Sequence, residues 1–171
     1  RFFNKPLAKT LQLIAQTKGE AFYKGTLADA ICDCALEHGA ALNRDDMAAH
    51  KVDWCGTLSK KFDALELHEI PPNGQGITAL MALGILSHTR IRELNSDDPL
   101  AIHLQVEAIK LALVDAETYV ADDKYMSEVT SKNLLDEAYL ARRAALIDET
   151  CAQDFKIGAP INGGTVYLTA A

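Results

Sequence analysis

Apolar residues recur every three or four positions along most of the chain, which is the spacing of one face of a helix. This pattern predicts amphipathic helices over residues 6–17, 20–38, 100–120 and 133–148. Between them, Ile77 to Ser87 is apolar on almost every face, as expected of a helix buried between layers. The pattern therefore favours a helix-rich α+β fold.

Short polar signals mark the ends of these helices. Gly25 is expected to interrupt the second helix, and Gly39 to end it in the positive-φ conformation of a C-terminal cap. Asn43, followed by Asp45 and Asp46, opens a further short helix, because its side chain can cap the free N–H groups while the two acids face the positive helix end.

The helix predicted over residues 100–120 is the longest, and Ser96 or Asp98 opens it. Its opposite face is expected to carry Gln105 and Glu107. The apolar residues at helical spacing are expected to form its buried stripe; they are Ile102, Val106, Ile109 and Leu113.

From Lys51 the apolar period falls to two, which predicts a hairpin or two neighbouring strands ending at Pro71-Pro72. The alternating apolar positions are Val52, Trp54, Phe62, Leu65, Leu67 and Ile70. Residues 150–162 show no period and are expected to form a loop. A chain of 171 residues is long enough for one core, so we predict a single domain over residues 1–171.

Composition narrows the possible partners. The net charge of -7 and the pI near 5.2 oppose binding to nucleic acid, since no dense group of Lys and Arg offsets them. The longest apolar run, Ile77 to Leu86, is far shorter than the roughly 20 residues of a membrane span. The chain begins Arg1-Phe2-Phe3 and ends within an apolar run, so we expect part of a longer protein and leave its compartment open.

Neither the cysteines nor the acids form a convincing metal site. Cys32 and Cys34 lie two apart, so on a helix they point to different faces. Buried or half-buried free thiols are expected at these positions and at Cys55 and Cys151. His103 and Glu107 share a helical face without a second histidine, which favours a solvated face. The nearby Asp115, Glu117, Asp122 and Asp123 are interpreted in the same way. No cofactor is predicted.

The loop Pro71-Pro72-Asn73-Gly74-Gln75-Gly76 precedes the all-apolar helix and could cradle an anion at the helix start. It lacks the lysine of a phosphate-binding loop and the glycine register of a dinucleotide fold. A structural turn from strand to helix is therefore favoured.

The run Asn162-Gly163-Gly164-Thr165-Val166-Tyr167-Leu168 offers one candidate nucleophile, Thr165. If the bond after Gly164 is cut, the freed α-amine, with a pKa of about 8, can act as the base for the hydroxyl of the same residue. Glycine suits such a cut because it tolerates strained backbone and crowds its carbonyl least. The alternative is a glycine turn that leads into a half-buried strand.

Several stretches together resemble the gamma-glutamyltranspeptidase family, in a branch that includes acylase-like proteins. They occur in the family's order over nearly the whole chain, although no single one is diagnostic. The stretches are Leu7–Leu11 with Ile14-Ala15, Phe22–Gly25 with Ala28 and Ile31, Leu42–Ala49, Pro71–Leu86, Glu107–Ala112 and Gly163–Leu168.

The resemblance implies an N-terminal-nucleophile hydrolase with a layered α/β/β/α fold, made as a precursor that cleaves itself before a threonine. By this resemblance Gly164 and Thr165 form the processing site, residues 1–164 belong to the large subunit, and residues 165–171 begin the small subunit. The implied reaction is transfer or hydrolysis of a gamma-glutamyl or related acyl group through an acyl-threonine intermediate. The implied partners are a small-molecule substrate and the small subunit of the same precursor.

Some positions depart from the pattern of the glutathione-type members. Asn73-Gly74-Gln75-Gly76 replaces their serine-serine-glycine-glycine run, Ala116 stands where arginine is common, and Val166 where many have a second threonine. Two alternatives therefore stay open: an acylase of other amides, such as beta-lactam side chains, and a non-catalytic structural or binding domain of the same fold. With Thr165 still joined to Gly164, the chain by itself is expected to be inactive.

Overall fold

The protein is described from a computed structural model that covers residues 3–161. The chain divides into two compact units, Arg1–Trp54 and Cys55–Ala171, where the length had predicted one domain. Residues 50–57 connect them and have no helix or strand. Val52 and Trp54, which were predicted to belong to the strand pair, lie in this connection outside both strands and are largely exposed.

The first unit is a small group of helices: α1 (Lys5–Gln16), α2 (Glu20–Tyr23), α3 (Thr26–Glu37) and α4 (Arg44–Ala49). Gly25, at φ 90°, separates α2 from α3, as the sequence predicted. Asn43 forms the expected capping box with Asp46 at the start of α4. The core contains Ala28, Cys32 and Met47.

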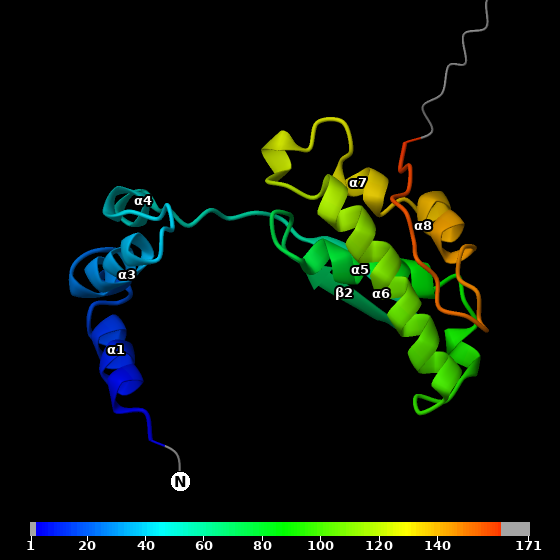
Figure 1. Cartoon of the computed structure of the whole chain (residues 1–171), viewed down its shortest axis with the longest axis horizontal. Coiled ribbons are helices and arrows are strands. Elements are labelled where there is room, and N and C mark those ends of the chain that lie inside the picture. Colours follow the sequence, from blue (N-terminus) through cyan, green and yellow to red (C-terminus); the bar gives the residue numbers. More distant parts are fainter. Residues whose placement is uncertain (1–2, 162–171) are drawn as a thin grey trace, which may run out of the picture. The chain divides into compact units, whose positions relative to one another are not determined.

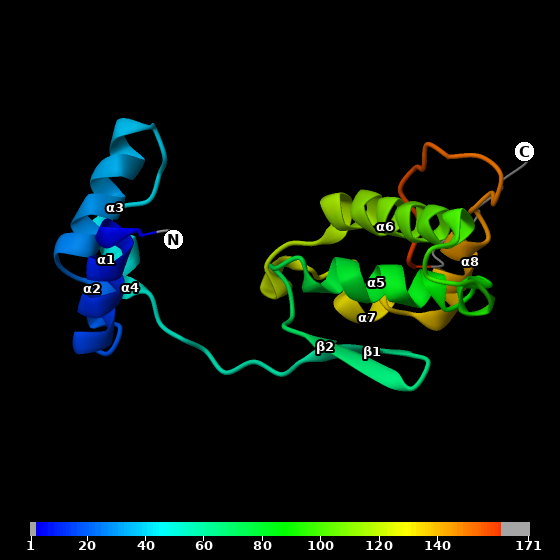
Figure 2. The same cartoon turned by 90° about the horizontal axis from the view of Figure 1, so that it is seen from below.

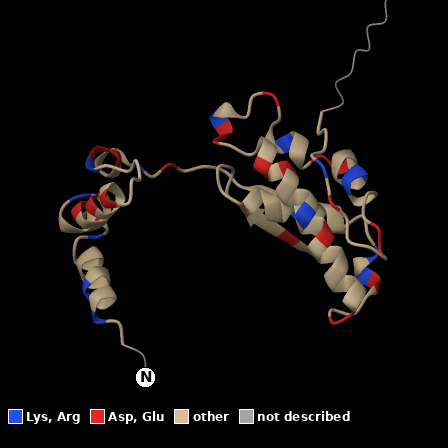
Figure 3. Cartoon of the chain, in the orientation of Figure 1, with Lys and Arg blue, Asp and Glu red and all other residues tan. Residues whose placement is uncertain are grey.

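Charged residues gather on α3 and α4 (Figure 3). Arg44 of α4 lies 2.6 Å from both Asp29 and Asp33 of α3. All three side chains are about half exposed, so solvent screens the pairs and they contribute little to stability. The four cysteines are free, as predicted, but the expectation that they are buried or half-buried holds only for Cys32. It was wrong for Cys34, Cys55 and Cys151, which are exposed.

The second unit contains a hairpin, β1 (Leu58–Phe62) and β2 (Leu65–Glu69), followed by helices (Figure 1). The strands pair antiparallel with Leu58 opposite Glu69 and Phe62 opposite Leu65. The helices are α5 (Gly76–Leu86), α6 (Pro99–Tyr119), α7 (Ser131–Leu134) and α8 (Glu137–Ala144), with short 3-10 turns at Ile91–Glu93 and Asp123–Tyr125. None of the described helices is long and apolar enough to cross a membrane.

Helix α5 forms the centre of the second unit. It lies between the hairpin and α6 (Figure 2), and Ile77, Leu80, Met81 and Ile85 are fully buried. The prediction of a helix buried on most of its surface is thus confirmed. The helix-rich α+β class is confirmed as well, with one two-stranded sheet in the described part of the chain.

The prediction of which side of α6 is buried was wrong. Ile102, Val106, Ile109 and Leu113 are between 36% and 54% exposed. The buried face instead carries Ala101, Leu104, Glu107, Ala108, Leu111, Ala112 and Asp115. Its alanines allow α5 to approach closely, and its two carboxylates tolerate burial because both have partners, as described below.

The amphipathic stretch predicted over residues 133–148 is also divided. Helix α7 ends at Leu134, and Asp136 then caps α8 by accepting a hydrogen bond from the Tyr139 N–H. When a side chain such as that of Asp136 accepts the hydrogen bond of a backbone N–H, it replaces a carbonyl of the preceding turn. The helix before it therefore ends and a new helix begins. The restart at Asp136 places Tyr139 and Arg143 on the buried side of α8.

Candidate functional site

Gly164 and Thr165, the predicted processing site, lie outside the described residues. The structure reaches Ile161 and shows the segment that leads toward them, residues 152–161, here called the approach segment. This segment has no helix or strand, as the sequence predicted for residues 150–162. Its backbone N–H and C=O groups therefore need partners elsewhere.

Glu107 of α6 holds the beginning of the approach segment. Its carboxylate is 1% exposed and accepts hydrogen bonds from the Gln153 backbone N–H (3.0 Å) and the Lys110 ammonium (2.7 Å). Burial by itself would raise the pKa of Glu107, but these two donors outweigh it and hold the pKa below its ordinary value. Glu107 is therefore an ionised anchor near neutral pH.

Asp115, two turns further along α6, holds the middle of the segment. One oxygen accepts a hydrogen bond from the Gly158 N–H (2.8 Å), and the other accepts from the Tyr139 hydroxyl (2.6 Å). Arg143 Nε lies 2.9 Å from the second oxygen in a buried ion pair. Burial and the bond to Asp115 raise the pKa of Tyr139, so its hydroxyl remains a donor.

Two more side chains bind the same stretch of backbone. The Tyr119 hydroxyl donates to the carbonyl of Gly158 (2.7 Å), and Arg143 Nη2 donates to the carbonyl of Lys156 (2.9 Å). Together with Glu107 and Asp115, these residues of α6 and α8 satisfy four backbone groups of the approach segment. Side chains thus supply the backbone hydrogen bonds that a neighbouring strand would supply in a sheet.

Position 158 has no room for a side chain, which explains the glycine there. A Cβ atom at this position would lie 2.3 Å from the Tyr139 hydroxyl oxygen and 3.0 Å from Cδ of Arg143. Only a residue without a side chain lets the backbone approach α6 and α8 this closely.

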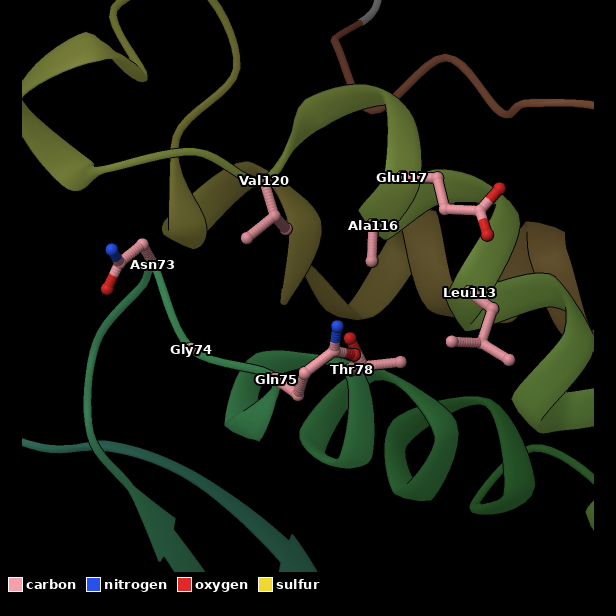
Figure 4. Close-up of a pocket in the computed structure, with 8 residues that line it drawn as sticks. All are labelled: Asn73, Gly74, Gln75, Thr78, Leu113, Ala116, Glu117 and Val120. Carbon is pink, nitrogen blue, oxygen red and sulfur yellow. The ribbon is translucent and has the colours of Figure 1, made fainter. Parts of the chain in front are cut away.

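A separate cavity of about 220 Å³ lies between the start of α5 and the second half of α6 (Figure 4). Gln75 and Thr78 enter it from the α5 side, and Ala116 and Val120 face it from α6. Asn73, Gly74, Leu113 and Glu117 complete its lining. The predicted loop at the helix start thus forms one wall of a hollow.

The start of α5 itself is closely packed. A Cβ atom on Gly76 would lie 2.6 Å from Oε2 of Glu69, so a carboxylate already lies beside the positive end of this helix. This contact supports the structural interpretation of the loop rather than an anion cradle.

The sequence interpretation of the α6 acids was wrong in part. Glu107 and Asp115 were assigned to a solvated face, whereas both are buried. His103 contacts the Asp148 carbonyl rather than a metal-binding partner. Within residues 3–161 no three His, Cys, Asp or Glu side chains come together in a metal-binding group.

One signal in the sequence could have identified the anchors. Glu107 and Asp115 are spaced by eight residues, two helical turns, and Leu111 lies midway between them on the same face. Acids that share a face with leucine and alanine in an otherwise apolar helix indicate buried, paired carboxylates.

Comparison with known proteins places the chain in a family. The family model described as Gamma-glutamyltranspeptidase matches residues 1–171. The Glutathione hydrolase-like YwrD proenzyme of Bacillus subtilis (strain 168) is 31% identical over 144 residues, which are 84% of this chain and 27% of that protein. The Acylase ACY 1 proenzyme of Pseudomonas sp. (strain SE83) is 28% identical over 176 residues, 100% of this chain and 31% of that protein.

Solved structures agree with this placement. The cephalosporin acylase from Bacillus halodurans matches with a TM-score of 0.72 and 38% identity, over 90% of this chain and 28% of that chain. The chain belongs to the gamma-glutamyltranspeptidase family, which confirms the resemblance seen in the sequence. It spans between 27% and 31% of the length of these three relatives.

Proposed function

We propose that this chain is part of a self-processing enzyme precursor in which Thr165 becomes the N-terminal nucleophile. The observation that carries the proposal is the family match over the whole chain, which includes the Gly-Gly-Thr run. The names of the curated relatives support it, since both are proenzymes. On this proposal residues 1–164 belong to the large subunit and residues 165–171 begin the small one.

The proposed cleavage uses only groups of the chain and water. The Thr165 hydroxyl attacks the Gly164 carbonyl, the peptide nitrogen leaves as the α-amine of Thr165, and an ester joins the two residues. Water then hydrolyses the ester, leaving a carboxylate on Gly164 and a free hydroxyl on Thr165. The new α-amine is the base that the uncleaved chain lacks.

In the mature protein the same hydroxyl would attack the substrate. The α-amine takes the proton of the hydroxyl and passes it to the substrate nitrogen, which leaves as an amine. The acyl group is then held as an ester on Thr165. Water or an acceptor amine then removes the acyl group, which gives hydrolysis or transfer. We propose a gamma-glutamyl or related acyl amide as the substrate, and completion of the layered α/β/β/α fold by the remainder of the precursor.

A second candidate, an acylase of non-glutamyl amides, is favoured by two observations. The structure matched at 38% identity is a cephalosporin acylase. Asn73 and Gly74, which line the cavity at the start of α5, stand where the glutathione-type members carry their two serines. Rates of the mature enzyme on gamma-glutamyl and glutaryl anilides separate the candidates. Faster turnover of the glutaryl compound supports the acylase.

The processing proposal is tested on the full-length precursor. We expect N-terminal sequencing of the small subunit to begin at Thr165, and Thr165→Ala to remain uncut. Thr169→Ala is the matched control, since it removes a hydroxyl from the same short run and should be processed normally. A small subunit that begins elsewhere, or normal cutting of Thr165→Ala, would contradict the assignment and favour the non-catalytic alternative.

A further inference from the structure

We propose that Asp115 and Gly158 form a clamp that positions the Gly164–Thr165 peptide for self-cleavage. This inference rests on the proposed function and adds positioning residues to it. We assign these residues a positioning role, without a part in the chemical step itself. They act by fixing the place from which the chain approaches the bond that is cut.

The contacts of Gly158 are the first part of the argument. Its N–H is bound by Asp115 and its carbonyl by Tyr119, at 2.8 Å and 2.7 Å, so both polar groups of one residue are held. Asp115 is itself fixed by Tyr139 and Arg143 and is 0% exposed. An anchor with this many buried partners gives the backbone a single orientation.

The position of the clamp is the second part. Gly158 lies seven positions before Thr165, and the next tether back along the chain is the Lys156 carbonyl, nine positions before Thr165. If the clamp served only to shorten a flexible loop, losing it would change the rate by less than about twofold, because loop entropy varies slowly with length. Orientation has a larger effect, since a misplacement of about 1 Å can slow a positioned reaction about a hundredfold.

The fit of Gly158 provides a specific test. Its backbone is not in the left-handed region, so alanine is disfavoured only by the contact with Tyr139 and Arg143. Gly158→Ala therefore displaces the approach segment without removing any side chain from the core. Gly56→Ala is the matched control, because a Cβ atom there meets nothing within 4 Å.

The experiment follows self-cleavage of the purified full-length precursor by gel and intact mass. We expect Gly158→Ala to slow cleavage about tenfold, and Gly56→Ala to match the wild type. The processed fraction of Gly158→Ala should keep the wild-type kcat and KM, which separates positioning for cleavage from general damage to the enzyme.

The possible results distinguish a failure of the proposed function from a failure of the clamp alone. If the wild-type precursor is never cut before Thr165, the proposed function fails and the clamp fails with it. If the wild type is cut there and Gly158→Ala is slower by twofold or less, only the clamp is overturned. If circular dichroism shows that Gly158→Ala does not fold, Tyr119→Phe decides, since it removes only the donor to Gly158: unchanged cleavage overturns the clamp and slower cleavage supports it.

Discussion

Glu107 and Asp115 lie on the buried face of α6, where an unpaired carboxylate would be strongly destabilising. Each instead has an ionic partner on one side and a backbone N–H of the approach segment on the other. Their burial therefore depends on a segment some forty residues away in sequence. At the scale of single residues, these two acids connect the longest helix to the chain leading toward Thr165.

The lowered pKa of Glu107 predicts a pH-dependent contribution to stability. A carboxyl whose pKa is lower in the folded state stabilises the fold above its unfolded pKa of about 4.3 and loses that effect as pH falls through the folded value. We expect Glu107→Gln to reduce the free energy of unfolding by about 2 kcal/mol at pH 7, the value of hydrogen bonds to a charged group. Urea titrations at pH 7 and pH 3 should show this difference shrinking in acid, and a constant difference would contradict it.

Helix α6 carries apolar residues on two sides, and packing against its neighbour α5 determines which side is buried. The β-branched Ile102 and Val106 lie on the exposed side, whereas the buried side carries alanines together with Leu104 and Leu111. Close contact between helices favours small residues at the crossing, so the tightest interface need not be the side with the largest hydrophobic residues.

Two alanine substitutions test the assignment of the buried face. Leu104→Ala should lower the free energy of unfolding by about 2–5 kcal/mol, because Leu104 is 1% exposed and its removal leaves a cavity. Val106→Ala, on the half-exposed side, should change it by about 0.5 kcal/mol or less. Equal effects in chemical denaturation would mean that α6 buries both sides.

In the whole molecule, the two compact units are joined by residues 50–57, which form no helix or strand. A connection without secondary structure or buried side chains is open to proteases. The fold of each unit is held by its own core, around Met47 in the first and Ile77 in the second.

Limited trypsin digestion tests this division. Lys51 lies in the exposed connection, whereas Lys60 lies in β1 and pairs with Glu137 of α8. We expect cleavage after Lys51 well before cleavage after Lys60, since a protease must bind extended and accessible backbone. Mass spectrometry of early fragments gives the order, and simultaneous cleavage at both sites would contradict the division.

Much of the secondary structure could be predicted from local signals. Gly25, Asn43 and Asp98 separate or cap helices as expected, because capping depends on the residue and its immediate neighbours. The hairpin was found, although its first strand begins at Leu58 rather than near Val52. The buried face of α6 could not be predicted, since both of its sides carry apolar residues and only the neighbouring α5 selects one.

The sequence by itself determined the helix-rich class, the family and Thr165 as the candidate nucleophile, because these depend on residue type, order and spacing along the chain. Only the tertiary structure decided that Glu107 and Asp115 are buried anchors and that Gly158 must lack a side chain. The physical reason is that a carboxylate on a helix is stable either in solvent or buried beside a partner. Which of the two occurs depends on whether a partner distant in sequence lies next to it. The Gly-Gly-Thr run names a candidate nucleophile, while the contacts of the approach segment support a specific proposal for how it is positioned.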